Sequence, residues 1–159
     1  MTTTTLEVGQ MAPEFRLKGP GGQWVSLSDY LGRQNVVLVF FPLAFSPVCS
    51  HQLPEVQKHA DEFRGLDAEV FGVSVDSHYS NEAFARSLRL EFPLLSDFKR
   101  QAMTAYGVLN PDAGYSGRAV FVIDKQGRIA YMDVSANPGD IAQIPSNQRL
   151  LEALRDLPR

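Results

Sequence analysis

The feature that most constrains the fold is an apolar run in the first third of the chain, Asn35-Val36-Val37-Leu38-Val39-Phe40-Phe41, which ends at Pro42. Its residues are mostly β-branched or aromatic, and they follow one another without polar interruptions. A strand with water on one face would alternate, so this run predicts a strand that is covered on both faces. We therefore expect a central strand in a sheet that has helices packed on each side.

Helix-like and strand-like segments alternate after this run. Apolar side chains at spacings of three and four predict a helix from Pro47 to Arg64, which Pro54 should kink. The further elements predicted are strand 70–76, helix 81–90, strand 92–95, helix 100–106, strands 119–123 and 128–134 joined by a tight turn, and a last helix capped by Ser146. This order, β-α-β-α-β-α-β-β-α, predicts an α/β three-layer sandwich with parallel central strands and an antiparallel pair at the end. A turn signal at 19–22 adds an N-terminal β-hairpin.

Composition narrows the class of protein. At 159 residues the chain has the size of one domain, taken as 1–159, and its 44% hydrophobic and 21% charged residues are typical of soluble globular proteins. A net charge of −3 argues against nucleic acid or a membrane surface as a partner. The threonine-rich start has no secretory pattern and no apolar run is long enough to span a membrane, so we expect a cytoplasmic protein.

The chain has one cysteine, Cys49, so it can form neither an intrachain disulfide nor a two-cysteine redox motif. Cys49 lies just after the buried strand, where the next helix starts. Ligand sites in open α/β sheets lie at the carboxyl ends of strands, and a helix N-terminus favours a thiolate. Position alone leaves two readings open, a reactive thiol or a small buried apolar residue.

The residues around the cysteine favour the reactive thiol. Pro42-x-x-x-Ser46-x-x-Cys49 resembles the active-site signature of the peroxiredoxins, a family of thiol-dependent peroxidases. Further segments that resemble this family are Val8–Phe15, Phe92–Asp97, Ala105–Val108 and Arg118–Asp124, while Phe40–Phe45 resembles its AhpE-type one-cysteine subgroup. The resemblance implies a thioredoxin-like fold with a mixed central sheet, antioxidant activity at a redox-active centre, and a homodimer.

The resemblance also implies roles for individual residues. Arg118 matches a distant arginine that completes the site, Ser46 stands where the family more often has threonine, and Gln52 stands where many members have glutamate. Because an amide carries no charge, the usual link from this position to an arginine is in question.

We expect Ser46, Arg118 and the backbone N–H groups of Val48 and Cys49 to bind the peroxide, and Pro42 to keep water from the thiolate. Phe45 lies in the same loop. An apolar patch for a dimer contact or an alkyl substrate could be formed by Phe45 together with Tyr79, Val108, Leu109 and Tyr115.

These residues predict a peroxidase that reduces hydrogen peroxide and organic hydroperoxides through a sulfenic acid on Cys49, which an external thiol then reduces. That reductant could be a low-molecular-weight thiol, a thioredoxin or a glutaredoxin-like protein. The alternative is a redox sensor or holdase with little turnover. A disulfide-exchange enzyme would need a second cysteine. No cofactor or metal is expected, because His51, His59 and His78 follow no known ligand spacing.

Overall fold

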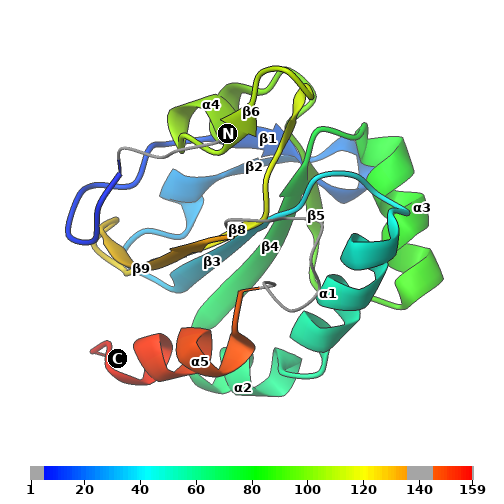
Figure 1. The fold of residues 1–159 in the computed structure, drawn as a ribbon. Helices are drawn as coiled ribbons and strands as arrows, with labels where there is room; N and C mark the ends of the chain where they lie inside the picture. The colour runs from blue at the N-terminus through cyan, green and yellow to red at the C-terminus, as the bar shows by residue number, and fades with distance from the viewer. Residues whose placement is uncertain (1–5, 136–144, 159) are drawn as a thin grey trace.

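The computed structural model describes residues 6–135 and 145–158, which form a mixed β-sheet with helices on both faces (Figure 1). The strands of the sheet are β1 (Arg16–Lys18), β2 (Trp24–Ser26), β3 (Asn35–Phe40), β4 (Ala68–Ser74), β5 (Leu94–Ser96), β8 (Ala119–Ile123) and β9 (Ile129–Val134). The helices are α1 (Pro47–Gln57), α2 (Ala60–Gly65), α3 (His78–Leu88), α4 (Gln101–Ala105) and α5 (Asn147–Arg155), with 3-10 turns η1 (Pro20–Gly22) and η2 (Leu27–Asp29). A separate small ladder pairs β6 (Leu109–Asn110) with β7 (Tyr115–Ser116).

The order of the strands across the sheet is β2-β1-β5-β4-β3-β8-β9. Strands β3, β4 and β5 are parallel to one another, whereas β8 pairs antiparallel with β3 and β9 antiparallel with β8. At the other edge β1 and β2 form the N-terminal hairpin. The predicted mixed sheet, with a parallel centre and antiparallel additions, is therefore confirmed.

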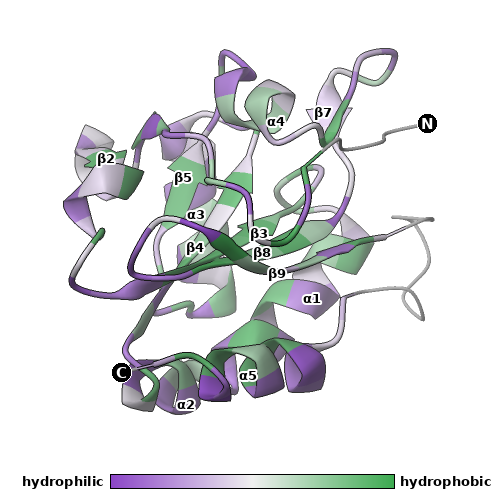
Figure 2. Ribbon diagram, turned by 90° about the vertical axis from the view of Figure 1, so that its left-hand side faces the viewer, coloured by the Kyte–Doolittle hydropathy of each residue, from purple (hydrophilic) through white to green (hydrophobic). Residues whose placement is uncertain are grey.

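Strand β3 lies at the centre of two apolar layers, because its six residues are all buried. Val37 and Val39 pack on the face covered by α1, α2, α3 and α5, while Leu38 and Phe40 pack on the face that α4 covers. Figure 1 shows this division, with α4 on one side of the sheet and the longer helices on the other. In Figure 2 the strands are mostly hydrophobic and α5 carries its hydrophilic residues on its outer side. The predicted three-layer sandwich is thus confirmed.

The predicted helix from Pro47 to Arg64 is wrong in one respect, because two helices occupy this stretch. Helix α1 runs through Pro54 and ends at Gln57, and α2 begins at Ala60. Pro54 does not end the helix, because Lys58 N still bonds the Pro54 carbonyl at 3.1 Å, and the break falls at His59, whose φ of −101° and ψ of 11° are not helical. Cys49 lies in the first turn of α1, because this helix begins at Pro47 as predicted.

Other boundaries follow the capping residues. Ser77 accepts a hydrogen bond from Ser80 N, so α3 begins three residues before the predicted start at Asn81. Ser146 accepts one from Arg149 N, as predicted for the last helix. The turn between β8 and β9 is also as predicted, with a bond from Gly127 N to the Asp124 carbonyl at 3.0 Å.

Candidate active site

The first turn of α1 brings the only cysteine to the carboxyl end of β3. Pro47 is the first residue of the helix, which suits proline because the missing N–H has no helical partner there. The first helical hydrogen bond runs from Ser50 N to the Ser46 carbonyl at 2.9 Å. The N–H groups of Val48 and Cys49 precede this bond, so they are among the donors that a helix leaves for an anion at its N-terminus.

The Cys49 side chain is fully buried, with 0% of its surface exposed, and packs in the apolar cluster beneath the sheet. Burial is what a small apolar residue would show, so it does not by itself separate the two readings of the cysteine. The polar groups around the first turn of α1 must decide between them.

Arg118 is the most informative of these groups, because it is charged and only 2% exposed. Its position follows from the sheet: Phe40 pairs with Ala119, so Arg118 lies beside Phe41, next to the loop that leads to Cys49. Its Nη1 donates a hydrogen bond of 2.8 Å to Oε1 of Gln52. Gln52 is also 2% exposed and lies one helical turn after Cys49, on the same face of α1. A buried cation is therefore held against the helix face that carries the cysteine.

This contact answers the question that the sequence left open at Gln52. The link from this position to an arginine is present, with an amide oxygen in place of a carboxylate. The amide oxygen orients the guanidinium of Arg118 toward α1 and, unlike a carboxylate, adds no negative charge beside it.

Between β3 and α1 the chain makes a compact loop. Pro42 is buried directly after β3. Ser46 Oγ donates to the Leu43 carbonyl at 2.9 Å, so in this arrangement the hydroxyl proton closes the loop and the oxygen lone pairs remain as acceptors. Before the loop, Phe41 is tied to the small β6–β7 ladder, because its carbonyl accepts a bond from Ser116 Oγ at 3.2 Å.

Phe45 has an unusual conformation in this loop. Its φ of 66° lies in the left-handed region, which costs a residue with a Cβ about 1–2 kcal/mol. Its ring is 57% exposed, and one side packs on Phe84 of α3 with ring centroids 4.9 Å apart. Phe45 thus joins the surface near the cysteine to the core below α3.

The predicted apolar patch is only partly at the surface. Tyr79 is 73% exposed, and Leu109 and Tyr115 are half-buried in the small β6–β7 ladder. Val108 is fully buried in the cluster on the α4 face, so its assignment to the patch is wrong. It follows a helix and a glycine turn, and that local pattern does not distinguish a core residue from a surface one.

The structure adds a residue that sequence reasoning missed. Asp76, two residues after β4 ends, accepts a hydrogen bond from Ala44 N of the loop at 2.8 Å. The contact joins residues 32 apart in the chain. The one feature of the sequence that could have indicated this contact is an acidic residue just beyond the carboxyl end of a central strand.

The histidines have ordinary surroundings. His59 contacts Glu62 at 2.8 Å and His78 contacts Glu82 at 3.2 Å, while His51 is exposed. Within residues 6–135 and 145–158, no three His, Cys, Asp or Glu side chains gather as they would around a metal ion.

Over the same residues, each helix is too short or too polar to cross a lipid bilayer.

Comparison with known proteins identifies the family of this chain. A sequence profile of the AhpC/TSA family matches residues 8–132. The chain belongs to this family. Among curated relatives, alkyl hydroperoxide reductase E of Mycobacterium tuberculosis is 38% identical over 138 residues, which cover 86% of this chain and 90% of that protein. A putative peroxiredoxin of Synechocystis is 37% identical over 163 residues, covering 96% and 80% of the two chains.

Solved structures show the same fold. The reduced 2-Cys peroxiredoxin of Plasmodium vivax superposes with a TM-score of 0.83 at 28% identity, covering 93% of this chain and 80% of that one. AhpC of Mycobacterium tuberculosis gives a TM-score of 0.82 at 28% identity, with 94% and 92% covered. The expected thioredoxin-like peroxiredoxin fold is therefore confirmed.

Proposed function

We propose that this chain is a one-cysteine, thiol-dependent peroxidase that reduces hydrogen peroxide and organic hydroperoxides. The observation that carries the proposal is the buried Arg118 guanidinium, held at 2.8 Å by Gln52 on the helix face that carries Cys49. A structural cysteine has no need of a buried cation beside its helix. The names of relatives in the AhpC/TSA family, alkyl hydroperoxide reductase E among them, support the same activity.

In the proposed reaction the Cys49 thiolate attacks the terminal oxygen of the peroxide. A sulfur–oxygen bond forms as the O–O bond breaks, so sulfur is oxidised by two electrons and the peroxide is reduced. The terminal oxygen keeps its proton and gives a sulfenic acid on Cys49. The other oxygen leaves with the electron pair and takes a proton to become water or an alcohol.

The protein's part is to stabilise charge as it moves from sulfur to the leaving oxygen. Arg118 would favour the thiolate and hold a peroxide oxygen, and the Val48 and Cys49 N–H groups would add donors at the helix terminus. Ser46 Oγ would accept a hydrogen bond from the peroxide, or donate one after turning from Leu43. Pro42, buried in the loop, would exclude water, and Phe45 would border the entrance for an organic substrate.

The sulfenic acid needs an external reductant, because the sequence holds no second cysteine to resolve it. A first thiol would attack the sulfenic sulfur and release water, giving a mixed disulfide on Cys49. A second thiol would release Cys49 and leave the reductant as a disulfide. A low-molecular-weight thiol, a thioredoxin and a glutaredoxin-like protein all meet this requirement.

Two further parts of the proposal concern assembly and location. We place the dimer contact at the exposed rings of Phe45 and Tyr79, because exposed aromatic side chains are favoured at protein interfaces. We place the protein in the cytoplasm, since its cycle consumes thiols, which a reducing compartment supplies.

The test is to mix reduced protein with one equivalent of hydrogen peroxide and follow peroxide loss and Cys49 oxidation together. Sulfenic acid is trapped chemically and located by mass spectrometry. Trp24 fluorescence is a poor signal for this reaction, because Trp24 lies on β2, which three strands separate from β3. Adding excess thiol should then give many turnovers per protein. If the protein consumes one equivalent of peroxide and none of the three classes of thiol supports further turnover, the result would favour the sensor or holdase. If Cys49 is not oxidised, both functions are refuted.

A further inference from the structure

One carboxylate outside the peroxide-binding residues contacts the backbone of the active-site loop directly. Asp76 lies just beyond the end of β4, and its Oδ2 accepts the Ala44 N–H at 2.8 Å. Ala44 stands midway between Pro42 and Ser46, so this bond fixes the centre of the loop. A hydrogen bond from a backbone N–H to a carboxylate is among the stronger ones in proteins.

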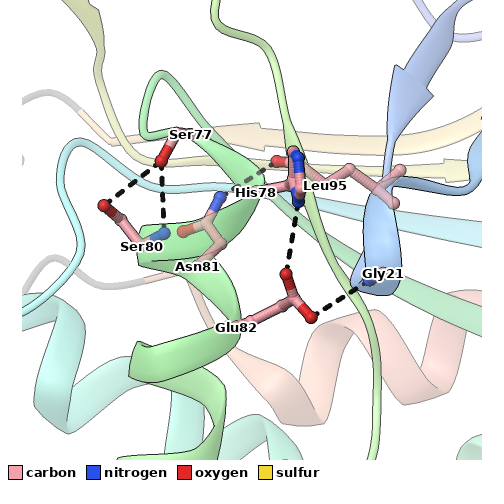
Figure 3. Close-up of polar contacts among 7 residues, drawn as sticks. All are labelled: Gly21, Ser77, His78, Ser80, Asn81, Glu82 and Leu95. Carbon is pink, nitrogen blue, oxygen red and sulfur yellow. Dashed lines mark hydrogen bonds and ion pairs between the residues drawn. The ribbon is translucent and has the colours of Figure 1, made fainter.

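The carboxylate is itself held by a buried polar chain. Ser74 Oγ, at the fully buried last residue of β4, lies 2.8 Å from the same Oδ2 and accepts a bond from Asp76 N at 3.3 Å. Ser74 Oγ is also 3.2 Å from Oδ1 of Asn81, which is fully buried on α3. Figure 3 shows the next link, in which the Asn81 amide donates to the Leu95 carbonyl of β5. The loop is thus anchored through Asp76 to β4, α3 and β5.

The loop needs such an anchor. Phe45, next to Ala44, holds a positive φ, a conformation that persists only where surrounding contacts enforce it. Its ring contact with Phe84 is one such contact, the Ser46 Oγ bond to the Leu43 carbonyl is a second, and the Asp76 bond to Ala44 ties the loop to β4. Cys49 has no exposed surface, and Ala44 of the loop packs against the apolar cluster that contains it. Loosening the loop would therefore expose the sulfur and displace the residues placed around it.

We propose that Asp76 is a positioning residue, which holds the segment Pro42–Ser46 closed over Cys49 in the arrangement that reacts with peroxide. Asp76 does not touch the reacting atoms and acts through the Ala44 N–H. This role rests on the proposed peroxidase function.

Two rates measured on the reduced protein separate positioning from general stability. One is the second-order rate of Cys49 oxidation by hydrogen peroxide, which needs the closed loop. The other is alkylation of Cys49 by iodoacetamide, which is bulkier than hydrogen peroxide and must reach a sulfur that has no exposed surface in this structure. Loosening the loop lowers the first rate and raises the second.

In Asp76→Ala we expect peroxide oxidation to slow by about tenfold or more and alkylation to accelerate. A tenfold change corresponds to the lower end of the free energy that a hydrogen bond to a charged group contributes. Asp76→Asn keeps the shape and one acceptor oxygen, so it should recover part of both rates. If Asp76→Ala does not fold, the same opposite changes, in smaller size, must appear in Asp76→Asn.

Glu82 provides the matched control. Its Oε1 accepts the Gly21 N–H at 3.0 Å and its Oε2 lies 3.2 Å from His78 Nδ1, so it also ties a turn to α3, but at η1 (Figure 3). Glu82→Ala should lose thermal stability and leave both rates within about twofold of the wild type. The proposal is overturned if Asp76 variants keep the wild-type rates, or if Glu82→Ala changes them equally. A wild-type protein that does not react with peroxide would instead refute the peroxidase function.

Discussion

The contact between Gln52 and Arg118 gives a prediction whose size follows from the structure. Both side chains are 2% exposed and the bond between Oε1 and Nη1 is 2.8 Å long. Gln52→Leu keeps a side chain of similar size and removes the acceptor. A hydrogen bond to a charged group contributes about 1.5–3 kcal/mol, and a loss of about 2 kcal/mol lowers the Tm of a chain this long by about 4–8 °C.

The same substitution should slow the reaction of Cys49 with hydrogen peroxide. Without its acceptor on α1, the guanidinium loses the bond that orients it toward the helix face of the cysteine, and a less well oriented donor stabilises the transition state less well. We expect a decrease of about tenfold in the second-order rate constant, corresponding to about 1.4 kcal/mol. Thermal unfolding followed by circular dichroism and rapid-quench kinetics measure the two effects on one preparation.

Gln57→Leu is the control on the same helix. Its Oε1 accepts the Glu91 N–H at 2.7 Å at the surface, so the chemical change is identical but lies at the other end of α1. This variant should lose about 1 kcal/mol or less and react at the wild-type rate. If Gln52→Leu matches Gln57→Leu in both stability and rate, Gln52 does not position Arg118 and the reasoning fails.

Three further outcomes are expected. Arg118→Ala should slow peroxide oxidation by about 10²-fold or more with an unchanged circular dichroism spectrum, as for loss of one oxyanion donor. Arg128→Ala, which removes an exposed bond to the Gly9 carbonyl, should leave the rate unchanged, and equal rates in the two variants would remove Arg118 from the site. Burial raises the pKa of Asp97 above its ordinary 3.8, against the opposing backbone N–H bonds from α4. The folded state therefore binds the carboxyl proton of Asp97 more tightly than the unfolded state does. As the pH falls from 7 through the folded pKa, the free energy of unfolding of the wild type should rise relative to that of Asp97→Asn. Urea unfolding measures both, and a difference between the two proteins that does not change with pH would contradict this. Ser146→Ala removes the cap on Arg149 N and should lower the free energy of unfolding by about 1 kcal/mol in the same assay, and no change would show that the cap does not support α5.

Local patterns made the core of the fold predictable. The run from Asn35 to Phe41 is apolar on both faces because helices cover both faces of β3, so its sequence alone indicated a central strand. Ser146 was predictable as a cap for a similar reason, since its partner lies three residues away. The strands β6 and β7 were not predicted, because two-residue strands have no measurable periodicity.

The residues of the site also differ in how far local sequence patterns predict them. Cys49 and its loop lie within a few residues of one another, so their spacing was visible in the sequence. Arg118 was assigned from a resemblance alone, because its contact with Gln52 spans 66 residues. Asp76 was missed, since nothing local marks an aspartate that binds a backbone N–H on a neighbouring loop. Contacts of this kind depend on the order of strands in the sheet, which the sequence does not state.

The most direct test of the account is the rate constant of the Cys49 thiolate with hydrogen peroxide, compared with that of free cysteine thiolate under the same conditions. Arg118 and the donors at the start of α1 should together accelerate the reaction by about 10³-fold or more. Cys49→Ser should abolish the fast phase. A Cys49 that reacts no faster than free cysteine would contradict the claim that these residues form a peroxidase site.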